Sequence, residues 1–241
     1  MSSNVFFHSG DLGDCIASLP TIRQLGGGRL ILGNRNGIGG REPMTQARFD
    51  VLAPLLSEQE YIEEVVRQDD PSDITHDFHL FRTKPPPTGD PNCGELGYNL
   101  ATWQAQWFGI TDVDLSPWLR VLQHDLRSVG RAILSRTLRY QNPGFGWPAV
   151  MLKYALPIFV GLPEEWSEFQ KLASEDVDYI ATANLLEVAA LIAGSEIFVG
   201  NQSAPCWVAI GLGHRLIQEM DQCVSNRNSV VKRENADFVS C

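Results

Sequence analysis

The sequence predicts an α/β protein made of two small halves that face each other across a cleft, each built on a parallel sheet. Short apolar runs that suit buried strands alternate with helical patterns along the chain. This order of elements is typical of parallel sheets that are covered by helices on both faces. The alternation breaks over 111–127 and then starts again. We therefore place a domain boundary there, with domains at 1–118 and 119–241.

The first half begins with a strand, a glycine turn and a helix. The run NVFFHS (4–9) is short and apolar, as a buried strand requires. Over 11–25, apolar residues recur with the i, i+3, i+4, i+7 spacing of a helix, which the glycines at 26–28 end. A second strand is expected at 29–34. Further on we expect a helix within 44–56, a strand over 74–81, a loop over the proline-rich segment 82–92 and a helix over 96–110.

The second half repeats this order of elements. The helix over 163–173 begins with proline and carries acids in its first turn, as helix N-termini favour. Asn184 suits the N-cap of a helix over 184–193. The remaining expected elements are strands over 129–135, 155–162, 196–201 and 214–219 and a helix over 203–213.

Composition excludes several classes of protein. Apolar residues make up 44% of the 241 residues and charged residues 20%, which is ordinary for a folded domain. The net charge of −10 repels polyanions and acidic membranes, so we expect no stable nucleic-acid binding, and a bound phosphate must be held by local groups. The N-terminus lacks a signal-peptide pattern, and no stretch approaches the roughly 18 apolar residues of a membrane span. We expect a cytoplasmic protein without a transmembrane segment.

Cysteine and histidine spacing argues against a metal site. His76 and His79 form an H-x-x-H, but a strand over 74–81 would direct the two imidazoles to opposite faces. Metal ligands must converge, so no metal is expected. The cysteines are odd in number, scattered and without a C-x-x-C pair, which also disfavours a disulfide framework. They are Cys15, Cys93, Cys206, Cys223 and Cys241.

The stretch HSGDLGDCIASLP (8–20) carries the first functional signal. A glycine turn between a strand and a helix directs backbone N–H groups at a ligand above the sheet. The dinucleotide fingerprint G-x-G-x-x-G is absent and the second strand ends in Asn34, which disfavours a nicotinamide cofactor. Gly13 is followed by Asp14 and Cys15 instead of the G-K-[ST] of a P-loop, which excludes nucleotide hydrolysis by that route. The two carboxylates, Asp11 and Asp14, suit a general base for a hydroxyl group or, alternatively, cap the first helical turn.

Two distant motifs resemble a known family. G-D-L-G-D-C-I-A-S-L-P-T-I-R-Q-L (10–25) resembles the N-terminal motif of the ADP-heptose:lipopolysaccharide heptosyltransferases, glycosyltransferase family 9. N-L-L-E-V-A-A-L-I-A-G-S-E-I-F-V-G-N-Q-S-A-P-C-W-V-A-I-G-L-G (184–213) is similar to the donor-site pattern of that family. A fainter similarity lies in V-G-L-P-E-E (160–165), where the family has a strand followed by G-G-P-x-E.

The resemblance implies the GT-B fold, in which two Rossmann-like domains face each other across a cleft. It further implies inverting sugar transfer without a metal or cofactor, with the acceptor on the first domain and the nucleotide sugar on the second. The catalytic base falls on Asp14, and Gly10, Asp11 and Gly13 are the acceptor-side residues. The acid after the turn of the fainter motif falls on Glu165, and the donor-phosphate loop falls on Gly200, Asn201, Gln202, Ser203, Ala204 and Pro205.

The residues of this loop agree with that role. A strand that ends at Gly200 and a helix that starts near Ser203 place free N–H groups at a helix N-terminus, where they can stabilise a leaving diphosphate. Three positions depart from the family pattern: its aspartate is Gln202 here, its glycine is Ala204 and its histidine is Trp207. A donor other than ADP-heptose, or loss of binding, would follow from such changes.

Further candidates follow the strands of the second half. Arg136 and Arg139 come after its first strand, where ligands of doubly wound sheets bind, and either guanidinium could neutralise a diphosphate or lie on the surface. Glu219 ends the last expected strand and could hold a ribose. Trp147 could stack on a base, but packing under the loop is the favoured interpretation.

The sequence as a whole predicts a GT-B glycosyltransferase that moves a hexosyl or heptosyl group from a nucleotide-sugar donor to a hydroxyl of a glycan or another acceptor. Two alternatives stay open. The departures from the family pattern fit a noncatalytic module that binds nucleotide sugars, and the fold also occurs in sugar-nucleotide epimerases.

Overall fold

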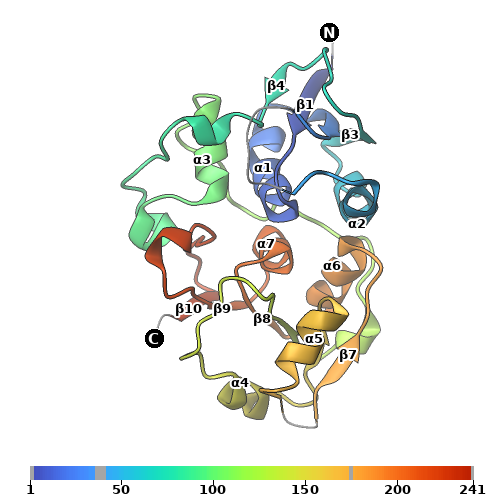
Figure 1. Cartoon of the computed structure of the whole chain (residues 1–241), viewed down its shortest axis with the longest axis vertical. Coiled ribbons are helices and arrows are strands. Elements are labelled where there is room, and N and C mark those ends of the chain that lie inside the picture. The colour runs from blue at the N-terminus through green and yellow to red at the C-terminus, as the bar shows by residue number, and fades with distance from the viewer. Residues whose placement is uncertain (1–2, 36–41, 174–175, 240–241) are drawn as a thin grey trace.

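The computed structural model describes residues 3–35, 42–173 and 176–239. These residues form two parallel sheets, one above the other in Figure 1, with strand orders β3-β2-β1-β4 and β10-β9-β8-β5-β6-β7. Helices pack against these sheets, and the predicted α/β fold with two parallel-sheet domains is confirmed. Within the described ranges, no helix is long and apolar enough to cross a bilayer.

The first sheet belongs to the first half of the chain. Its strands lie at Asn4–His8 (β1), Gly28–Leu32 (β2), Ile62–Arg67 (β3) and His76–Asp77 (β4). Its helices are Leu12–Gln24 (α1), Gln46–Ser57 (α2) and Leu100–Trp107 (α3), with 3₁₀ turns at Phe81–Thr83 (η1) and Pro91–Leu96 (η2).

The second sheet belongs to the second half. Its strands are Ala132–Ser135 (β5), Ile158–Val160 (β6), Asp178–Ile180 (β7), Ile197–Asn201 (β8), Leu216–Glu219 (β9) and Ala236–Val239 (β10). Its helices are Trp147–Lys153 (α4), Pro163–Phe169 (α5), Leu185–Gly194 (α6) and Ala204–Gly211 (α7), with 3₁₀ turns at Leu126–Ser128 (η3) and Val224–Asn226 (η4).

The strand order of each sheet reverses at one point, and such a point marks where ligands bind. In the first sheet the order reverses between β1 and β4, and in the second it reverses between β5 and β8. Ligands of open parallel sheets bind at the carboxyl ends of the strands beside such a reversal. The glycine turn after β1 and the loop after β8 both lie at these points.

The strand expected over 74–81 is wrong in extent. Only His76–Asp77 pairs with β1. The side chain of Asp77 then accepts a hydrogen bond from the backbone N–H of His79 at 2.8 Å, which turns the chain out of the sheet and into η1. Since His79 lies outside the strand, the argument from opposite strand faces does not apply to it.

The edge strands β3, β7 and β10 were not predicted, because their sequences lack the apolar pattern of a buried strand. β3 reads IEEVVR and exposes its two glutamates, and β7 and β10 also carry exposed positions. Helix α3 is shorter than the expected 96–110, because Asn99 and Thr102 form a reciprocal capping box that starts the helix at Leu100. Asn184 caps α6 as predicted, accepting a hydrogen bond from the N–H of Glu187.

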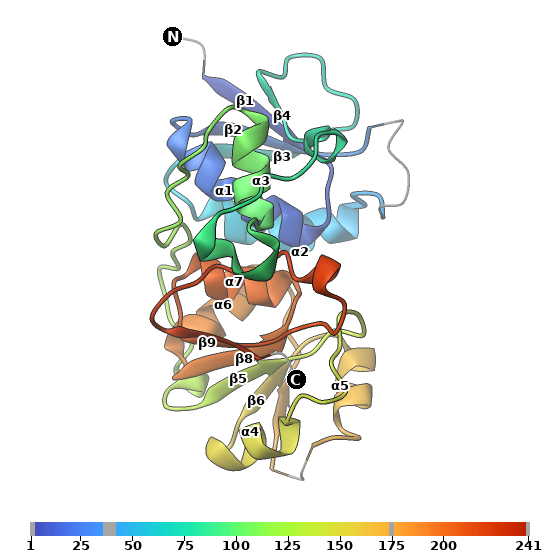
Figure 2. The same ribbon diagram turned by 90° about the vertical axis from the view of Figure 1, so that its left-hand side faces the viewer.

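The two halves pack directly against each other. Helix α1 packs on α7 and α2 packs on α6, and Figure 2 shows α6 and α7 between the upper helices and the lower sheet. A side-chain carbon at Gly13 would lie 3.0 Å from Cδ1 of Trp207, so this glycine lets α1 approach α7 closely. One apolar core runs through both halves and includes Ile16, Leu119 and Trp207. The predicted boundary at 118 and 119 stays a prediction.

Candidate active site

Two adjoining cavities lie between the halves. The first, which we call the sheet cavity, has a volume of about 360 Å³ and is lined by the segments that follow β5, β6, β7 and β8 and by residues of α1 and α2. The second, the Asp14 cavity, has a volume of about 510 Å³ and contains Asp14 and Gln202 from opposite halves. The residues that line both are Asp11, Gly13, Arg139, Ser203 and Ala204.

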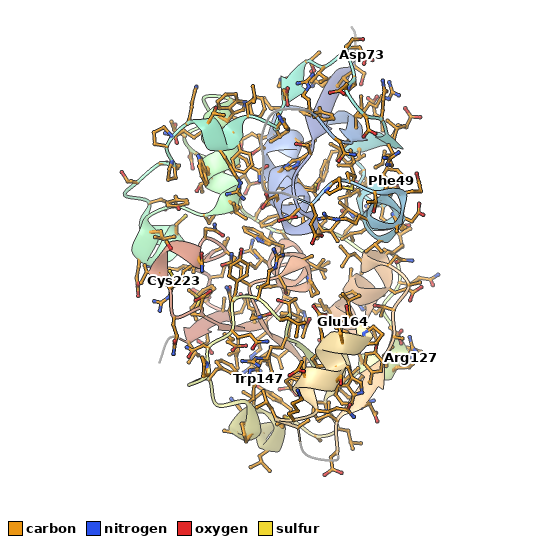
Figure 3. The ribbon with its side chains drawn as sticks, in the orientation of Figure 1. Phe49, Asp73, Arg127, Trp147, Glu164 and Cys223 are labelled. Carbon is orange, nitrogen blue, oxygen red and sulfur yellow. The ribbon has the colours of Figure 1, made fainter. Side chains whose placement is uncertain are left out.

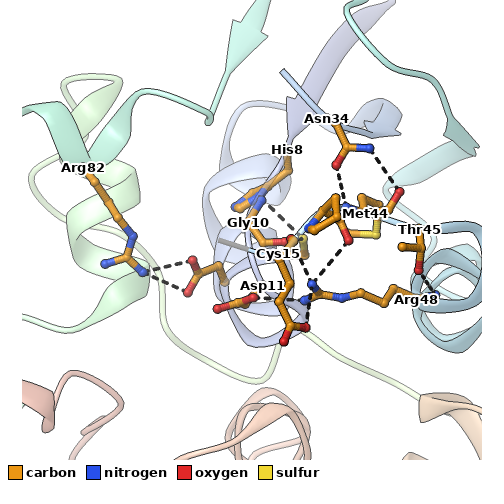
Figure 4. A network of polar contacts seen from close by, with 12 residues as sticks. His8, Gly10, Asp11, Cys15, Asn34, Met44, Thr45, Arg48 and Arg82 are labelled. Atoms are coloured by element: carbon orange, nitrogen blue, oxygen red, sulfur yellow. Dashed lines mark hydrogen bonds and ion pairs between the residues drawn. The ribbon is translucent and has the colours of Figure 1, made fainter. Parts of the chain in front are cut away.

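Asp14 lies in the first turn of α1 and is 5% exposed. One guanidinium nitrogen of Arg82, Nη2, donates to both of its oxygens, at 3.1 Å to Oδ1 and 2.9 Å to Oδ2 (Figure 4). Arg82 belongs to η1, within the segment that the sequence marks only as loop. No spacing in the sequence connects these two residues, because β4 and the turn after it bring them together.

A buried chain of hydrogen bonds supports the turn before α1. The backbone N–H of Gly10 donates to Nδ1 of His8 at 2.8 Å, so the Nε2 of His8 carries the proton and donates to Oε1 of Gln104 at 3.1 Å. The amide nitrogen of Gln104 in turn donates to the backbone carbonyl of Asp14 at 2.9 Å. This chain fixes the backbone on which the Asp14 carboxylate is carried.

Asp11 does not cap the helix through its side chain, although it occupies the N-cap position of α1. Its Oδ1 instead accepts a hydrogen bond from Nη2 of Arg48 on α2 at 3.0 Å (Figure 4). The capping interpretation therefore fails for Asp11. Both acids of the turn are held by arginines, one from α2 and one from η1.

The last two residues of β8, Gly200 and Asn201, fix the start of the loop that follows this strand. A side chain at Gly200 would lie 2.6 Å from the carbonyl oxygen of Ser135 on β5, so only glycine fits there. Asn201 is fully buried and binds the neighbouring loop: its Oδ1 accepts from the N–H of Thr137 at 2.9 Å, and its Nδ2 donates to the carbonyls of Thr137 and Arg139 at 3.0 and 2.6 Å. Asn201 therefore positions the loop that carries Arg139.

The N-terminus of α7 presents unpaired amides to both cavities. Ser203 is the N-cap, and its hydroxyl oxygen accepts a hydrogen bond from the N–H of Cys206 at 3.3 Å. Over the parts of the chain that the structure describes, the N–H groups of Ser203 and Ala204 have no acceptor. Two backbone donors at the positive end of a helix form an anion site.

The departures at Gln202 and Trp207 have structural partners here. The Nε2 of Gln202 donates to Oδ1 of Asn228 at 2.9 Å, and its Oε1 accepts from the hydroxyl of Ser229 at 3.1 Å. Trp207 is buried beneath Gly13 in the contact between α1 and α7. Gln202 therefore binds a neighbouring loop through both ends of its amide, and Trp207 fills the domain contact.

Arg139 is exposed at the border of the two cavities, with its guanidinium 5.5 Å from the centre of the Tyr140 ring. It forms no ion pair with any residue that the structure describes. Glu165 lines the sheet cavity, where its carboxylate accepts a hydrogen bond from the N–H of Leu162 at 2.8 Å. Burial raises the pKa of Glu165 above its ordinary value, more than the Leu162 bond and the Arg139 charge lower it.

Arg136 and Glu219 are brought together away from both cavities. Three hydrogen bonds of 2.9 to 3.2 Å join the guanidinium of Arg136 to the Glu219 carboxylate, which is fully buried. The carboxylate also accepts from the N–H of Asn142 and from the indole of Trp147, which packs within the second half (Figure 3). The pair neutralises itself, and neither residue lines the cavities.

Metal ligands do not cluster among the described residues: no group of three or more His, Cys, Asp or Glu side chains is placed to hold an ion. Among the described cysteines, Cys93, Cys206 and Cys223 are free thiols, and the Sγ of Cys15 lies 3.5 Å from Nδ1 of His8. Cys241 lies outside the described residues. Burial raises the pKa of Cys206 to about 12, so this thiol stays protonated at neutral pH.

Comparison with solved structures shows the same fold in glycosyltransferases. Over 99% of this chain and 87% of the other, it is similar to the glycosyl transferase family 9 protein of Veillonella parvula DSM 2008, at 12% identity and a TM-score of 0.62. It is also similar to the ADP-heptose lps heptosyltransferase II of E. coli, at 12% identity and a TM-score of 0.62, over 99% of this chain and 90% of the other. A third similar structure is the E. coli heptosyltransferase WaaC with ADP-2-deoxy-2-fluoro heptose, at 9% identity and a TM-score of 0.58, over 98% and 92% of the two chains.

These likenesses confirm the predicted GT-B-like fold and the resemblance on which it was based. No family model and no curated protein matches the sequence.

Proposed function

We propose that this protein is a glycosyltransferase that moves a sugar from a nucleotide-sugar donor to a hydroxyl of an acceptor, with inversion and without a metal. One observation carries the proposal. A buried carboxylate from the first half, Asp14, shares a single cavity with the unpaired amides of Ser203 and Ala204 from the second half. A proton acceptor thus lies across a cavity from an anion site.

The nucleoside of the donor fits the sheet cavity. This cavity lies at the carboxyl ends of β5, β6, β7 and β8, where parallel sheets bind nucleotides. The diphosphate then reaches the residues that the two cavities share, where the amides of Ser203 and Ala204 and the guanidinium of Arg139 supply positive charge. These local positive groups offset the repulsion between a polyanion and the net charge of −10.

In the transfer step, the acceptor hydroxyl enters the Asp14 cavity. Its oxygen forms a bond to the anomeric carbon while the bond from that carbon to the diphosphate oxygen breaks, and the hydroxyl proton moves to Asp14. The negative charge that develops on the diphosphate is stabilised by the α7 amides, the role that a metal has in other enzymes. Attack from the side of Asp14, opposite the leaving group, inverts the configuration.

The test combines donor binding with turnover. Calorimetry against ADP-, UDP-, GDP- and CDP-sugars identifies the donor, and release of nucleoside diphosphate in the presence of acceptors measures transfer. In Asp14→Asn we expect donor binding within about twofold of wild type and a rate roughly 10²–10⁴-fold lower, the contribution of a general base. Asp112→Asn, which changes an exposed aspartate that lines neither cavity, is the matched control.

Two results contradict the proposal. Transfer by Asp14→Asn at the wild-type rate removes Asp14 from the role of base. Donor binding by the wild-type protein without any turnover would instead favour a noncatalytic nucleotide-sugar-binding module, and isomerisation of the donor without an acceptor would favour an epimerase.

A further inference from the structure

The chain returns from the second half to the first between β9 and β10. We call residues 227–230, which follow η4, the crossing segment. The N–H of Leu100 donates to the carbonyl of Asn228 at 2.9 Å, and Nδ2 of Asn99 donates to the carbonyl of Val230 at 3.1 Å. Turn η4 also packs on η2, the adjoining red and green turns at the left of Figure 1. The crossing segment therefore has a fixed place on the first half.

A chain of hydrogen bonds joins this segment to the loop after β8. Gln218 of β9 donates from Nε2 to Oγ of Ser229 at 2.6 Å, and that hydroxyl donates to Oε1 of Gln202 at 3.1 Å. Gln202 then donates from Nε2 to Oδ1 of Asn228 at 2.9 Å. Gln218 and Ser229 are fully buried and Gln202 is 9% exposed, so most of the chain is shielded from solvent.

The buried end sets the direction of this chain. With Nε2 of Gln218 bonded to Ser229, only the Oε1 of Gln218 is left unpaired among the described residues. The reverse direction would leave its amide nitrogen unpaired instead, and an unpaired buried N–H is rarer in proteins than an unpaired carbonyl. The same direction fixes the amide of Asn228, whose oxygen faces Gln202. Its nitrogen, Nδ2, has no acceptor within the part of the chain that the structure describes.

The free end of the Asn228 amide belongs to the wall of the Asp14 cavity. Asn228 lines this cavity but not the sheet cavity. In the proposed function the diphosphate lies at the residues that the two cavities share, so a group that lines only the Asp14 cavity lies on the sugar side of it. The bond to Gln202, the residue before Ser203, keeps Asn228 beside the donor loop. An amide N–H at this place binds an oxygen that accepts a hydrogen bond, such as a sugar hydroxyl or ring oxygen.

We propose that Asn228 is a specificity-determining residue whose Nδ2 donates a hydrogen bond to an oxygen of the transferred sugar. The inference rests on the proposed function, because it assigns a contact of its donor. Asn228 touches the sugar but neither the attacking hydroxyl nor the bond that breaks, and Gln202 and Ser229 position it. A sugar without that oxygen would leave the amide unpaired and bind less tightly.

The experiment compares each nucleotide sugar with its own nucleoside diphosphate by calorimetry. The probes are ADP-, UDP-, GDP- and CDP-glucose, ADP-heptose and the four diphosphates. The ratio of the two affinities isolates the sugar, because a change at the diphosphate or in the fold alters both affinities alike. In Asn228→Ala we expect the diphosphate affinity to stay within about twofold of wild type and the ratio to fall about three- to tenfold, as expected for the loss of one hydrogen bond.

Two further variants separate the N–H donor from the rest of the cavity wall. Asn228→Asp keeps the oxygen to which Gln202 donates and removes the N–H, so the ratio should fall at least as far as in Asn228→Ala. Asn226→Ala is the matched control, because Asn226 lines the same cavity but its Nδ2 donates to Oδ2 of Asp221 at 3.0 Å. This control should keep the wild-type ratio. Thermal melts establish that each variant is folded.

A wild-type ratio in both Asn228 variants, or an equal fall in Asn226→Ala, would overturn the inference. Its failure is distinguishable from that of the proposed function. Release of nucleoside diphosphate that depends on Asp14, with an unchanged ratio in the Asn228 variants, refutes the sugar contact alone. A lowered ratio in those variants without any turnover by wild type refutes the transferase alone. If wild type binds none of the nucleotide sugars, both are refuted.

Discussion

Arg136 and Arg139 follow the same strand and have different surroundings. Arg136 is paired with the buried Glu219, whereas Arg139 stands exposed where the two cavities meet. The sequence offers both as phosphate ligands, because both follow β5 at a position where ligands bind. Of these two arginines, Arg139 lines both cavities and Arg136 lines neither, so donor binding depends on Arg139 in our account.

Replacing Arg139 with glutamine should weaken nucleotide binding. We expect the Kd for the nucleoside diphosphate of the donor to rise about tenfold, because a hydrogen bond to a charged group contributes about 1.5–3 kcal/mol before screening by solvent. The difference should shrink at high salt. Calorimetry measures both effects. The control is Arg215→Gln, an exposed arginine directly before β9, and equal Kd values for the two variants would contradict the role of Arg139.

Replacing Glu219 with glutamine should reduce stability. The neutral amide leaves the guanidinium of Arg136, whose side chain is only 10% exposed, without its counter-ion. Removing one member of a buried pair typically costs about 3–5 kcal/mol. Urea unfolding followed by circular dichroism measures the loss. Glu196→Gln, which breaks an exposed pair with Arg215, should cost less than about 1 kcal/mol, and a similar loss in both variants would show that the buried pair is unimportant.

The shifted pKa of His214 should make the free energy of unfolding depend on pH. Burial, with a smaller contribution from the nearby His124, lowers the pKa of His214 from 6.5 to about 4. His214 therefore binds a proton more tightly in the unfolded chain than in the folded protein. Its contribution to the free energy of unfolding decreases as the pH falls below the unfolded-state pKa, and the decrease ends near the folded-state pKa. At about pH 5 we expect wild type to have lost about 1–2 kcal/mol more than His214→Gln, relative to about pH 7. Parallel pH profiles for the two proteins would refute this.

At the scale of elements, the loop after β5 depends on the strand beside it. Asn201 at the end of β8 makes three hydrogen bonds to the backbone of this loop, so the position of Arg139 is set from a neighbouring strand. A strand end and a loop that are distant in sequence thus form one unit.

Asn201→Ala should release that loop. We expect faster hydrogen exchange at 136–142 and a loss of nucleotide affinity similar to that of Arg139→Gln, because the buried backbone groups lose their partners. The control is Asn235→Ala, an exposed asparagine whose side chain binds the carbonyl of Gly213. Unchanged exchange at 136–142 in Asn201→Ala would show that the loop is held by other contacts.

Elements with buried sequences could be predicted, and edge elements could not. β8 reads IFVGN with every residue buried, and the expected strand over 196–201 matches it closely. β3 exposes two glutamates and so lacks the apolar pattern of a strand, and β4 has only two residues, so the strand expected over 74–81 is too long. Their pairing comes from the sheet, through neighbours that local sequence does not reveal.

At the scale of the whole molecule, the resemblance and the alternation of elements were sufficient to predict the fold. They also identified the turn after β1 and the loop after β8, which the structure brings to one cavity. The role of Arg82 could not be predicted from the sequence, because its contact with Asp14 joins residues 68 positions apart through the turn after β4. The same is true of the Arg136 and Glu219 pair: each residue was singled out, but only the order of the strands shows that they neutralise each other.

The central claim is that the cleft between the halves holds a nucleotide sugar opposite Asp14. A crystal structure of the protein with the donor that calorimetry identifies tests it most directly. We predict the nucleoside in the sheet cavity, the diphosphate within hydrogen-bond distance of the Ser203 and Ala204 amides, and the anomeric carbon open to the Asp14 cavity. A donor bound outside the cleft, or one with its sugar directed away from Asp14, would contradict the account.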